Sequence, residues 1–388
     1  MNKYVIIGSS AVAIGAVQRL LKLDTKGQIT VISKEQEAPY NKCFLVDYLA
    51  NSKKAEQVYT KPLEFFKENN INLILGQEVV SIDSKAKKIK LNSGQHIDFD
   101  KLLLSMGSSP YKLNLPGCSA PGIFEFHTLE DTLNLKNYIK QNKAKSAIVV
   151  GAGLTGLECA DALWQLGLEI TIVERGPKLL ARCLNDSAGQ FLKKHINSLG
   201  VKVLLSAEVK EIILEKNKAA GVALADNVRI KADLIVLAPG VRPNFELAQY
   251  AGLALHNNFV VVNGYLQTSN QDIFAAGDLI CIKDLVSEQI VPSCMWQDAM
   301  LQGAFAANNM VASIQAISID QLKIYSGSMI IAQTHVFGKD IASCGSYNSG
   351  QELVDELVYQ KIDDGKGFLL VGCKQQLSLL KRSILKQI

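Results

Sequence analysis

Residues 147–156 read AIVVGAGLTG, and this stretch decides the fold. Its first half is an apolar run that ends in glycine, which is typical of a buried strand in a parallel sheet. A helical stretch over residues 154–166 follows, and a second apolar run at residues 170–174 predicts another strand. Together these segments predict a β-α-β unit of about 30 residues.

The glycines of this stretch complete the fingerprint G-x-G-x-x-G. Gly151 allows a tight turn out of the strand, Gly153 lets a pyrophosphate approach the backbone, and Gly156 lets the helix pack closely on the sheet. The N-terminus of the helix then offers N–H groups and a positive dipole to the phosphates. Glu174 ends the second strand, where a carboxylate accepts hydrogen bonds from a ribose and repels a 2′-phosphate. We therefore expect NADH to bind here, in preference to NADPH.

The same order of elements occurs near the start of the chain. A strand is predicted at residues 4–8, a helix at residues 11–23 and a second strand at residues 29–33. Each copy is followed later by another apolar run closed by glycine, at residues 102–107 and 234–240. We expect these runs to be the returning strands of two nucleotide-binding units.

The glycine turn of this first copy is degenerate. Gly8 is retained, but Ser10 and Ala13 hold the second and third glycine positions. Both replacements are small, so close approach of a phosphate remains feasible. The acid position is also altered, because Ser33 ends the strand and Glu35 lies two residues later.

Length, charge and hydropathy exclude several classes of protein. At about 150 residues per domain, 388 residues predict two or three domains. The 41 basic and 37 acidic residues leave a net charge of only +4, which does not favour nucleic acid or an acidic membrane as a partner. The apolar stretches end well before the ~20 residues of a bilayer span. The apolar start resembles a signal peptide, but its glycine and serine residues fit a strand–turn–helix better.

The cysteines and histidines show no metal-binding spacing. The eight cysteines include no CxxC pair, and the five histidines form no HxH or HExxH pattern, so no metal is expected. Scattered cysteines of this kind are typical of reduced thiols, which predicts a cytoplasmic protein.

Residues 268–278 read TSNQDIFAAGD and indicate the family. This stretch resembles the second flavin motif of the FAD-dependent pyridine nucleotide–disulfide oxidoreductase superfamily. The resemblance covers nearly the whole chain, in the order of FAD loop, SMG at residues 105–107, NAD loop, GVRPN at residues 240–244 and the final GD. It implies that Asp278 accepts a hydrogen bond from a ribityl hydroxyl and that Gly277 admits the flavin chain.

Three further segments resemble single-flavin reductases related to rubredoxin reductase and to the flavin part of assimilatory nitrite reductase. They are PYNKCFL at residues 39–45, WQDAMLQG at residues 296–303 and VFGKD at residues 336–340. The chain lacks the CxxxxC pair of the disulfide reductases, and its tail is shorter than theirs. Reduction of the glutathione or lipoamide type is therefore not expected.

The resemblance assigns roles to single residues of this chain. Lys42 would lie near the flavin, where a cation stabilises the negative charge of the reduced ring, and Glu158 would lie near the nicotinamide. The expected cofactor-binding positions are Gly8, Ser10, Ala13, Glu35, Lys42, Gly107, Gly151, Gly153, Gly156, Glu174, Gly277, Asp278 and Trp296.

Cys43 supports a different reaction. A second branch of the superfamily, which includes NADH oxidases and coenzyme A–disulfide reductases, places one redox cysteine in this segment, and Cys43 keeps its spacing to Tyr48 and Leu49. A thiolate near Lys42 would attack a disulfide or a peroxide. Against this interpretation, the flanking residues of that branch are absent. The other interpretation is that Cys43 is a small buried residue in a slot that accepts proline, and both interpretations stay open.

The sequence therefore predicts an α/β protein with two interleaved doubly wound domains and a small α+β C-terminal domain. The FAD domain would comprise residues 1–110 and 243–320, the NAD domain residues 111–242, and the C-terminal domain residues 321–388. The expected function is an NAD(P)H-dependent FAD oxidoreductase that delivers electrons to a separate acceptor, such as a rubredoxin or ferredoxin. The alternatives are a thiol–disulfide, peroxide or oxygen reductase that uses Cys43, and a non-catalytic nucleotide-binding flavoprotein subunit. Monomer and homodimer both remain open.

Overall fold

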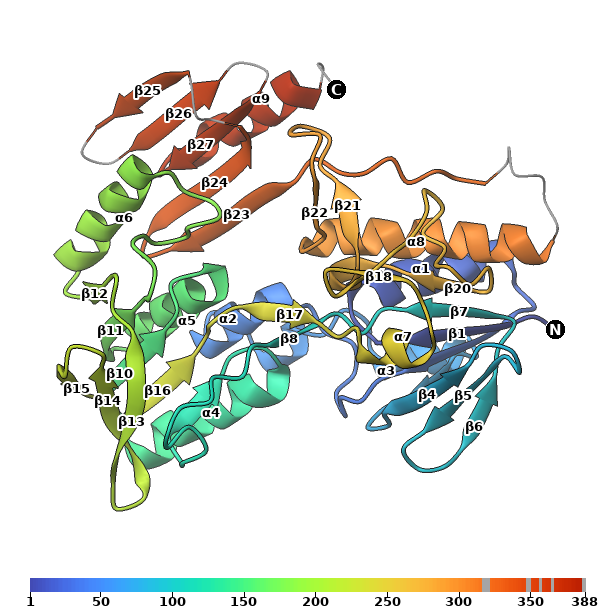
Figure 1. Cartoon of the computed structure of the whole chain (residues 1–388), viewed down its shortest axis with the longest axis horizontal. Coiled ribbons are helices and arrows are strands. Elements are labelled where there is room, and N and C mark those ends of the chain that lie inside the picture. Colours follow the sequence, from blue (N-terminus) through green and yellow to red (C-terminus); the bar gives the residue numbers. More distant parts are fainter. Residues whose placement is uncertain (316–321, 347–349, 356–357, 364–365, 386–388) are drawn as a thin grey trace. The chain divides into compact units, whose positions relative to one another are not determined.

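A computed structural model of the chain describes residues 1–315, 322–346, 350–355, 358–363 and 366–385. The chain divides into two compact units, each assembled from separate segments (Figure 1). The first unit comprises Met1–Cys43, Ala55–Ser109 and Arg242–Ser328. The second unit comprises Phe44–Lys54, Pro110–Val241 and Met329–Ile388.

The first unit is built on a five-stranded parallel sheet. Its strands, in spatial order, are β20 (Ile273–Ala275), β7 (Lys101–Leu104), β1 (Lys3–Ile7), β2 (Gln28–Ile32) and β3 (Asn72–Ile74). Strand β1 lies at the centre, where Ile7 is in register with Ile32 on one side and with Leu104 on the other. Its apolar residues are almost fully buried, as the continuous hydrophobic runs of the sequence predict.

Helices α1 (Ala11–Leu23) and α8 (Trp296–Ile314) lie side by side in this unit (Figure 1). Two glycines permit the close packing. A Cβ atom added to Gly15 would lie 2.0 Å from the carbonyl oxygen of Met300, and one added to Gly303 would lie 2.0 Å from that of Val12. Because real Cβ atoms are not found so close to a backbone oxygen, each helix needs a glycine at the crossing.

Smaller elements complete the first unit. They are the antiparallel sheet β4 (Val79–Asp83), β5 (Lys88–Leu91) and β6 (His96–Asp98), the hairpins β18 (Leu255–His256) with β19 (Phe259–Val260) and β21 (Cys281–Lys283) with β22 (Ile290–Pro292), and the short helices η2 (Ala55–Gln57), α3 (Leu63–Glu68), α7 (Glu246–Tyr250) and η3 (Gly277–Leu279). The short helix η1 (Lys42–Phe44) spans the end of the first segment.

The second unit repeats the parallel sheet. Its strands, in spatial order, are β12 (Lys202–Leu204), β11 (Glu169–Val173), β10 (Ser146–Val150), β16 (Leu234–Leu237) and β9 (Ile123–Glu125). The other elements of this part are helices α2 (Leu45–Leu49), α4 (Leu129–Asn142), α5 (Leu154–Gln165) and α6 (Asp186–Ser198), and the antiparallel sheet β13 (Val209–Glu215), β14 (Lys218–Leu224) and β15 (Arg229–Lys231). The linker strands β8 (Ser108–Pro110) and β17 (Val241–Pro243) pair with each other.

The C-terminal segment adds an antiparallel sheet and a helix to the second unit. The sheet contains, in spatial order, β23 (Ile331–Val336), β24 (Lys339–Gly345), β27 (Gly367–Val371), β26 (Tyr359–Asp363) and β25 (Gln351–Val354), and the helix is α9 (Lys374–Leu385). The predicted boundary between residues 320 and 321 lies outside the described residues, and the division into FAD and NAD domains stays a prediction.

The predicted fold class is confirmed. Both expected β-α-β units form, with helix α1 at the predicted bounds and helix α5 one residue shorter. The four strands of these units begin and end one residue earlier than predicted. After β1 and β10 the reason is the glycine itself, because Gly8 and Gly151 adopt positive φ angles of 107° and 111° and turn the chain out of the sheet.

Within the described part of the chain, no helix is both long and apolar enough to cross a membrane. The described residues also contain no group of three or more His, Cys, Asp or Glu side chains arranged to hold a metal ion.

Candidate cofactor-binding sites

The glycine turn of the second unit follows strand β10. A Cβ atom on Gly151 would lie 2.1 Å from the carbonyl oxygen of Ala238, which follows the neighbouring strand β16. A Cβ atom on Gly156 would lie 2.1 Å from the carbonyl oxygen of Gly151. The first and third glycines of the fingerprint are therefore required by close backbone contacts inside the turn itself.

The second glycine of the fingerprint faces open space. Gly153 is the N-cap of helix α5, and no described side chain caps this helix end. A Cβ atom added to Gly153 would meet nothing within 4 Å. An uncapped helix N-terminus beside open space has N–H donors and room for a phosphate group. The turn therefore fits the pyrophosphate of a dinucleotide.

The acidic residue of the second unit is held in place by the backbone. The two carboxylate oxygens of Glu174 accept hydrogen bonds from the N–H groups of Ala152 (2.7 Å) and Gly176 (2.6 Å). The side chain is half-buried. Each carboxylate oxygen can accept a second hydrogen bond, so Glu174 remains able to bind a ribose hydroxyl.

The glycine turn of the first unit follows strand β1. A Cβ atom on Gly8 would lie 2.2 Å from the carbonyl oxygen of Ser105. Ser10 is the N-cap of helix α1, and its hydroxyl makes no capping hydrogen bond to the helix. Ala13, at the third fingerprint position, is buried. This turn also combines a required glycine with an uncapped helix N-terminus, and it fits a second pyrophosphate.

The residues at the acid position of the first unit contact one another. The Oγ atom of Ser33 accepts a hydrogen bond from the N–H of Glu35 (3.2 Å). The Glu35 carboxylate accepts the hydroxyl of Tyr40 (2.6 Å), and its other oxygen lies 3.8 Å from the Nζ atom of Lys42. Glu35 and Lys42 thus form one half-buried ion pair on the segment that follows β2.

Asp278 lies in helix η3, directly after strand β20. Its Oδ2 atom accepts a hydrogen bond from the hydroxyl of Ser108 (2.6 Å). Burial raises the pKa of Asp278, while the hydrogen bond from Ser108 and the positive charge of Lys42 act in the opposite direction. Gly277 and Gly107 both adopt positive φ angles, 74° and 65°, which glycine adopts without a steric cost.

A buried polar network stabilises the backbone of the turn at Gly277. The N–H of Gly277 donates to Oε1 of Gln302 (2.8 Å), and Nε2 of Gln302 donates to Asp298 (2.5 Å) and Ser293 (2.7 Å). Trp296 is half-buried at the first position of the same helix, α8. Gln302 was not predicted as a site residue, although it belongs to the quoted segment WQDAMLQG.

Asn244 fixes the segment that follows strand β7. Its backbone N–H donates to the carbonyl oxygen of Gly107 (3.0 Å), and its Nδ2 atom donates to that of Met106 (2.8 Å). Its Oδ1 atom accepts the hydroxyl of Ser109 (2.7 Å). Ser108 and Asn244 were not predicted as site residues, although Asn244 ends the quoted segment GVRPN.

Glu158 lies on helix α5, within the second turn after Gly153. Its Oε1 atom accepts a hydrogen bond from the hydroxyl of Thr334 on strand β23 (2.6 Å). Burial raises the pKa of Glu158, and the negative charges of Asp47 and Asp161 raise it further, whereas the bond from Thr334 lowers it. A carboxyl group is thus present on the same helix that begins at the dinucleotide turn.

Cys43 lies in helix η1 and is exposed. Its backbone N–H donates to Oδ1 of Asn41 (2.9 Å). An exposed thiol is accessible to a substrate, so the position of Cys43 is compatible with redox chemistry.

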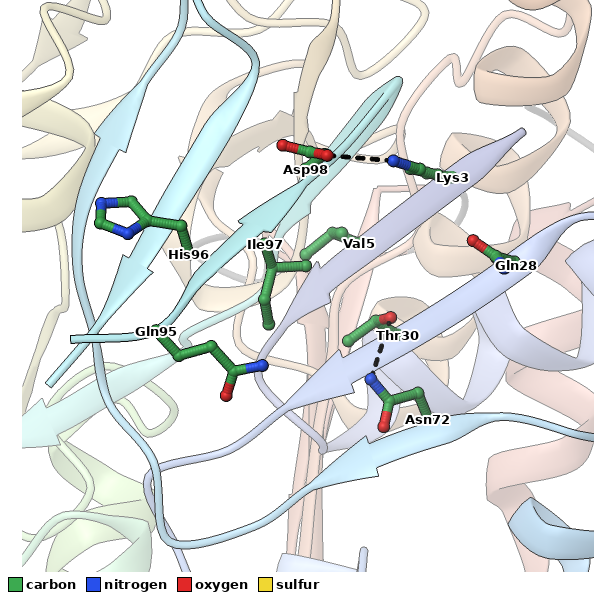
Figure 2. Close-up of a pocket in the computed structure, with 9 residues that line it drawn as sticks. All are labelled: Lys3, Val5, Gln28, Thr30, Asn72, Gln95, His96, Ile97 and Asp98. Atoms are coloured by element: carbon green, nitrogen blue, oxygen red, sulfur yellow. Dashed lines mark hydrogen bonds and ion pairs between the residues drawn. The ribbon is translucent and has the colours of Figure 1, made fainter. Parts of the chain in front are cut away.

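A cavity of about 300 Å³ lies in the first unit, at the amino ends of strands β1, β2 and β3 (Figure 2). Lys3, Gln28 and Asn72 line it, and they are the first residues of β1, β2 and β3. The glycine turns follow the last residues of parallel strands. Ligands of open α/β sheets bind outside the carboxyl ends of the strands, so this cavity is not the candidate cofactor site.

The structure therefore groups the predicted residues within each unit. In the first unit, Gly8, Gly107 and Gly277 follow the carboxyl ends of the adjacent strands β1, β7 and β20. The remaining predicted residues of this unit are Ser10, Ala13, Glu35, Lys42, Cys43, Asp278 and Trp296. In the second unit, the predicted residues are Gly151, Gly153, Gly156, Glu158 and Glu174.

Comparisons with known proteins identify the family. The sequence pattern of the pyridine nucleotide-disulphide oxidoreductase family matches residues 2–303. An NADH oxidase of Methanocaldococcus jannaschii is 31% identical over 318 residues, which cover 80% of this chain and 70% of the relative. The assimilatory nitrate reductase electron transfer subunit of Bacillus subtilis is 29% identical over 398 residues; the match covers all of this chain but only 49%, about half, of that protein.

A solved structure is similar over nearly its whole length. The NADH:rubredoxin oxidoreductase from Clostridium acetobutylicum superposes with a TM-score of 0.79 at 25% identity, over 99% of this chain and 95% of that one. The family uses FAD and NADH, so the predicted cofactors and the predicted class of NAD(P)H-dependent oxidoreductase are confirmed at the level of the family. With its two glycine turns, each at the carboxyl edge of a parallel sheet, the chain belongs to the pyridine nucleotide-disulphide oxidoreductase family.

Proposed function

We propose that this chain is an NADH-dependent FAD reductase that passes electrons to a small redox protein. The observation that carries the proposal is the presence of two turns with the same geometry in one chain. Both place a required glycine after a central parallel strand and an uncapped helix N-terminus beyond it. Two dinucleotides can therefore bind to one protein.

In this proposal the second unit binds NADH. The N–H groups at the start of helix α5 bind the pyrophosphate, and Gly153 leaves room for it. Glu174 accepts the ribose hydroxyls, and its negative charge disfavours the extra phosphate of NADPH. Glu158 contributes the carboxyl group at the nicotinamide end.

The first unit binds FAD through the corresponding turn. Ser10 and Ala13 allow the pyrophosphate to approach, and Asp278 accepts a ribityl hydroxyl in the position that Ser108 fixes. Lys42 supplies a positive charge near Asp278 and Glu35. Such a charge stabilises an anionic reduced cofactor.

The bound FAD supplies the redox chemistry. A flavin takes up a hydride from NADH, which carries two electrons and one proton, and it can release the electrons singly. The protein binds and orients the two partners and tunes the charge around them. The similarity to an NADH:rubredoxin oxidoreductase supports a small one-electron carrier as the acceptor.

An anaerobic titration of the purified protein with NADH tests this proposal. We expect the visible absorbance of the oxidised flavin to bleach after about one NADH per flavin. A protein that contains no FAD, and that takes up none when FAD is added, would contradict the proposal. A flavin that NADH does not bleach would contradict the hydride step.

A second candidate function uses Cys43 as a redox thiol. Its support is the exposure of Cys43 and the similarity of the chain to an NADH oxidase. In this case the titration would need about two NADH per flavin, because a second two-electron centre would be reduced as well. The variant Cys43→Ser should then need only one, whereas the first proposal expects one for both proteins.

A further inference from the structure

The hydrogen bond between Thr334 and Glu158 joins two segments that lie far apart in the sequence. Thr334 is buried on strand β23 of the C-terminal sheet, and Glu158 lies on helix α5 of the parallel-sheet region. The hydroxyl of Thr334 donates to Oε1 of Glu158 at 2.6 Å. A hydrogen bond to one oxygen fixes the plane of the carboxyl group and leaves its other oxygen for a second partner.

Strand β23 is fixed on helix α5 by the turn that follows it. Asp161, one turn after Glu158, accepts the backbone N–H of Phe337. The ring of Phe337 packs on that of Trp164, with 5.8 Å between the ring centroids. The carbonyl oxygen of Phe337 lies 2.7 Å from Nε2 of His195 on helix α6. These contacts hold Thr334 in register opposite Glu158.

Two acidic side chains act on the charge of Glu158. They are Asp47 on helix α2 and Asp161 on its own helix α5. Lys136 of helix α4 holds α2 in place, because its ammonium donates to the carbonyl oxygen of Tyr48 and to Oδ1 of Asn51. Thr334 is thus the neighbour whose hydrogen bond favours the charged form of Glu158, against burial and the two aspartates.

We infer that Thr334 is a positioning residue, whose hydroxyl holds the carboxylate of Glu158 for the nicotinamide end of a dinucleotide bound at the Gly151 turn. The small C-terminal sheet would therefore take part in recognising the pyridine nucleotide. A carboxylate accepts the N–H bonds of a nicotinamide carboxamide better than a protonated carboxyl group does. The inference rests on the proposed function, because Glu158 meets a nicotinamide only if the dinucleotide binds at this turn.

Loss of the hydroxyl should change how binding depends on pH. Without the bond from Thr334, the pKa of Glu158 rises, so the carboxylate is lost at a higher pH when the pH falls. The midpoint of the pH dependence of NAD⁺ affinity should move upward by about one pH unit in Thr334→Val. Thr334→Ser keeps the hydroxyl and should behave as the wild type does.

Calorimetric titration of the oxidised holoenzyme with NAD⁺ and with ADP-ribose, between about pH 5.5 and pH 8.5, tests the inference. ADP-ribose lacks the nicotinamide, so its affinity should be the same in all three proteins. In a Glu158→Gln background, which has no carboxyl group to titrate, Thr334→Val should shift nothing. Thermal melting of each variant shows whether it is folded.

The outcomes separate the inference from the function on which it rests. If NAD⁺ and ADP-ribose bind and Thr334→Val retains the wild-type pH midpoint, Thr334 does not position Glu158 and the inference is overturned. It is also overturned if Thr334→Val weakens NAD⁺ and ADP-ribose equally, because the effect is then structural. If neither ligand binds the wild-type protein, the proposed function fails, and the inference fails with it.

Discussion

The two glycine turns of this chain have similar backbone conformations, but glycine stands at different positions of the two turns. Gly8 and Gly151 have nearly equal positive φ angles, and each would bring a Cβ atom within 2.2 Å or less of a carbonyl oxygen after the neighbouring strand. At the third position, Gly156 is required by contact with its own turn, whereas Ala13 is accepted. In the first unit, close helix packing instead depends on Gly15, which meets helix α8. Glycine is therefore needed where backbone meets backbone, and the fingerprint covers such contacts inside the turns but not the helix contact at Gly15.

The acid positions differ as well, although the backbone around them is equivalent. The N–H groups of Ser33 and Glu174 both donate to the strand beyond them, to Ile74 and Leu204. Ser33 therefore occupies the position that Glu174 holds in the second unit. Its shorter side chain accepts the N–H of Glu35 two residues later, whereas Glu174 accepts the N–H groups of Gly176 and of Ala152 in the glycine turn. The first turn has lost its carboxylate.

The largest effect is expected for Gly151→Ala. Its Cβ atom would meet the carbonyl oxygen of Ala238 at 2.1 Å, in addition to the strain of a positive φ angle. We expect the free energy of unfolding to fall by about 3 kcal/mol and NADH binding to be lost. Chemical denaturation and an NADH titration measure both effects.

Gly167→Ala is the matched control for this substitution. Gly167 has a φ angle of 88°, but an added Cβ atom would meet nothing within 4 Å. The free energy of unfolding of Gly167→Ala should therefore fall only by the roughly 1–2 kcal/mol that a left-handed backbone conformation costs an alanine, and NADH binding should be retained. Gly8→Ala should resemble Gly151→Ala but deplete FAD. Equal stability losses in Gly151→Ala and Gly167→Ala would show that the close contact at Gly151 has no energetic weight.

A smaller and more selective effect is expected for Gly153→Ser, which gives the second turn the serine of the first. The added side chain has room, so the folded protein should be as stable as the wild type. Because Ser10 leaves its own helix uncapped, the new hydroxyl should also leave the N–H groups of helix α5 to a phosphate. We expect NADH affinity to fall by at most about 10-fold, or roughly 1 kcal/mol. A larger loss would show that the second turn, unlike the first, requires glycine at this position.

Glu174→Ser gives the second unit the serine that the first unit has at this position, Ser33. It removes a negative charge that disfavours a 2′-phosphate. The efficiency of reduction by NADPH, relative to that by NADH, should therefore rise by about 10-fold. Steady-state or stopped-flow reduction with each nucleotide measures the ratio. Glu174→Gln is the control, because it keeps the shape and the acceptor oxygen without the charge. If the ratio changes in neither variant, Glu174 does not select the nucleotide.

The turns could be predicted from the sequence because their constraints are local. The glycine that ends an apolar run lies against the backbone that follows the neighbouring strand of the sheet. The same contact is expected in any parallel unit of this kind, so the glycine marks it in the sequence. The contacts that complete the sites are different. Ser108 and Asp278 are separated by 170 residues, and Thr334 and Glu158 by 176. They depend on the register of distant strands and on how a helix packs, which no short motif records.

The smallest effect is expected for Glu35, because its carboxylate already has partners within the protein. Its carboxylate already accepts the hydroxyl of Tyr40 and faces Lys42 at 3.8 Å, in a pair that is about a third exposed. Partly exposed ion pairs contribute about 0–1 kcal/mol. Glu35→Gln keeps an acceptor for Tyr40, so FAD affinity should change by less than about threefold, measured by fluorescence on reconstitution of the apoprotein. Glu35→Ala, which also removes that acceptor, should weaken FAD somewhat more. A loss of tenfold or more in Glu35→Gln would mean that Glu35 has taken over the ribose contact that Ser33 cannot make, and the two units would then bind their nucleotides with the same chemistry from different positions.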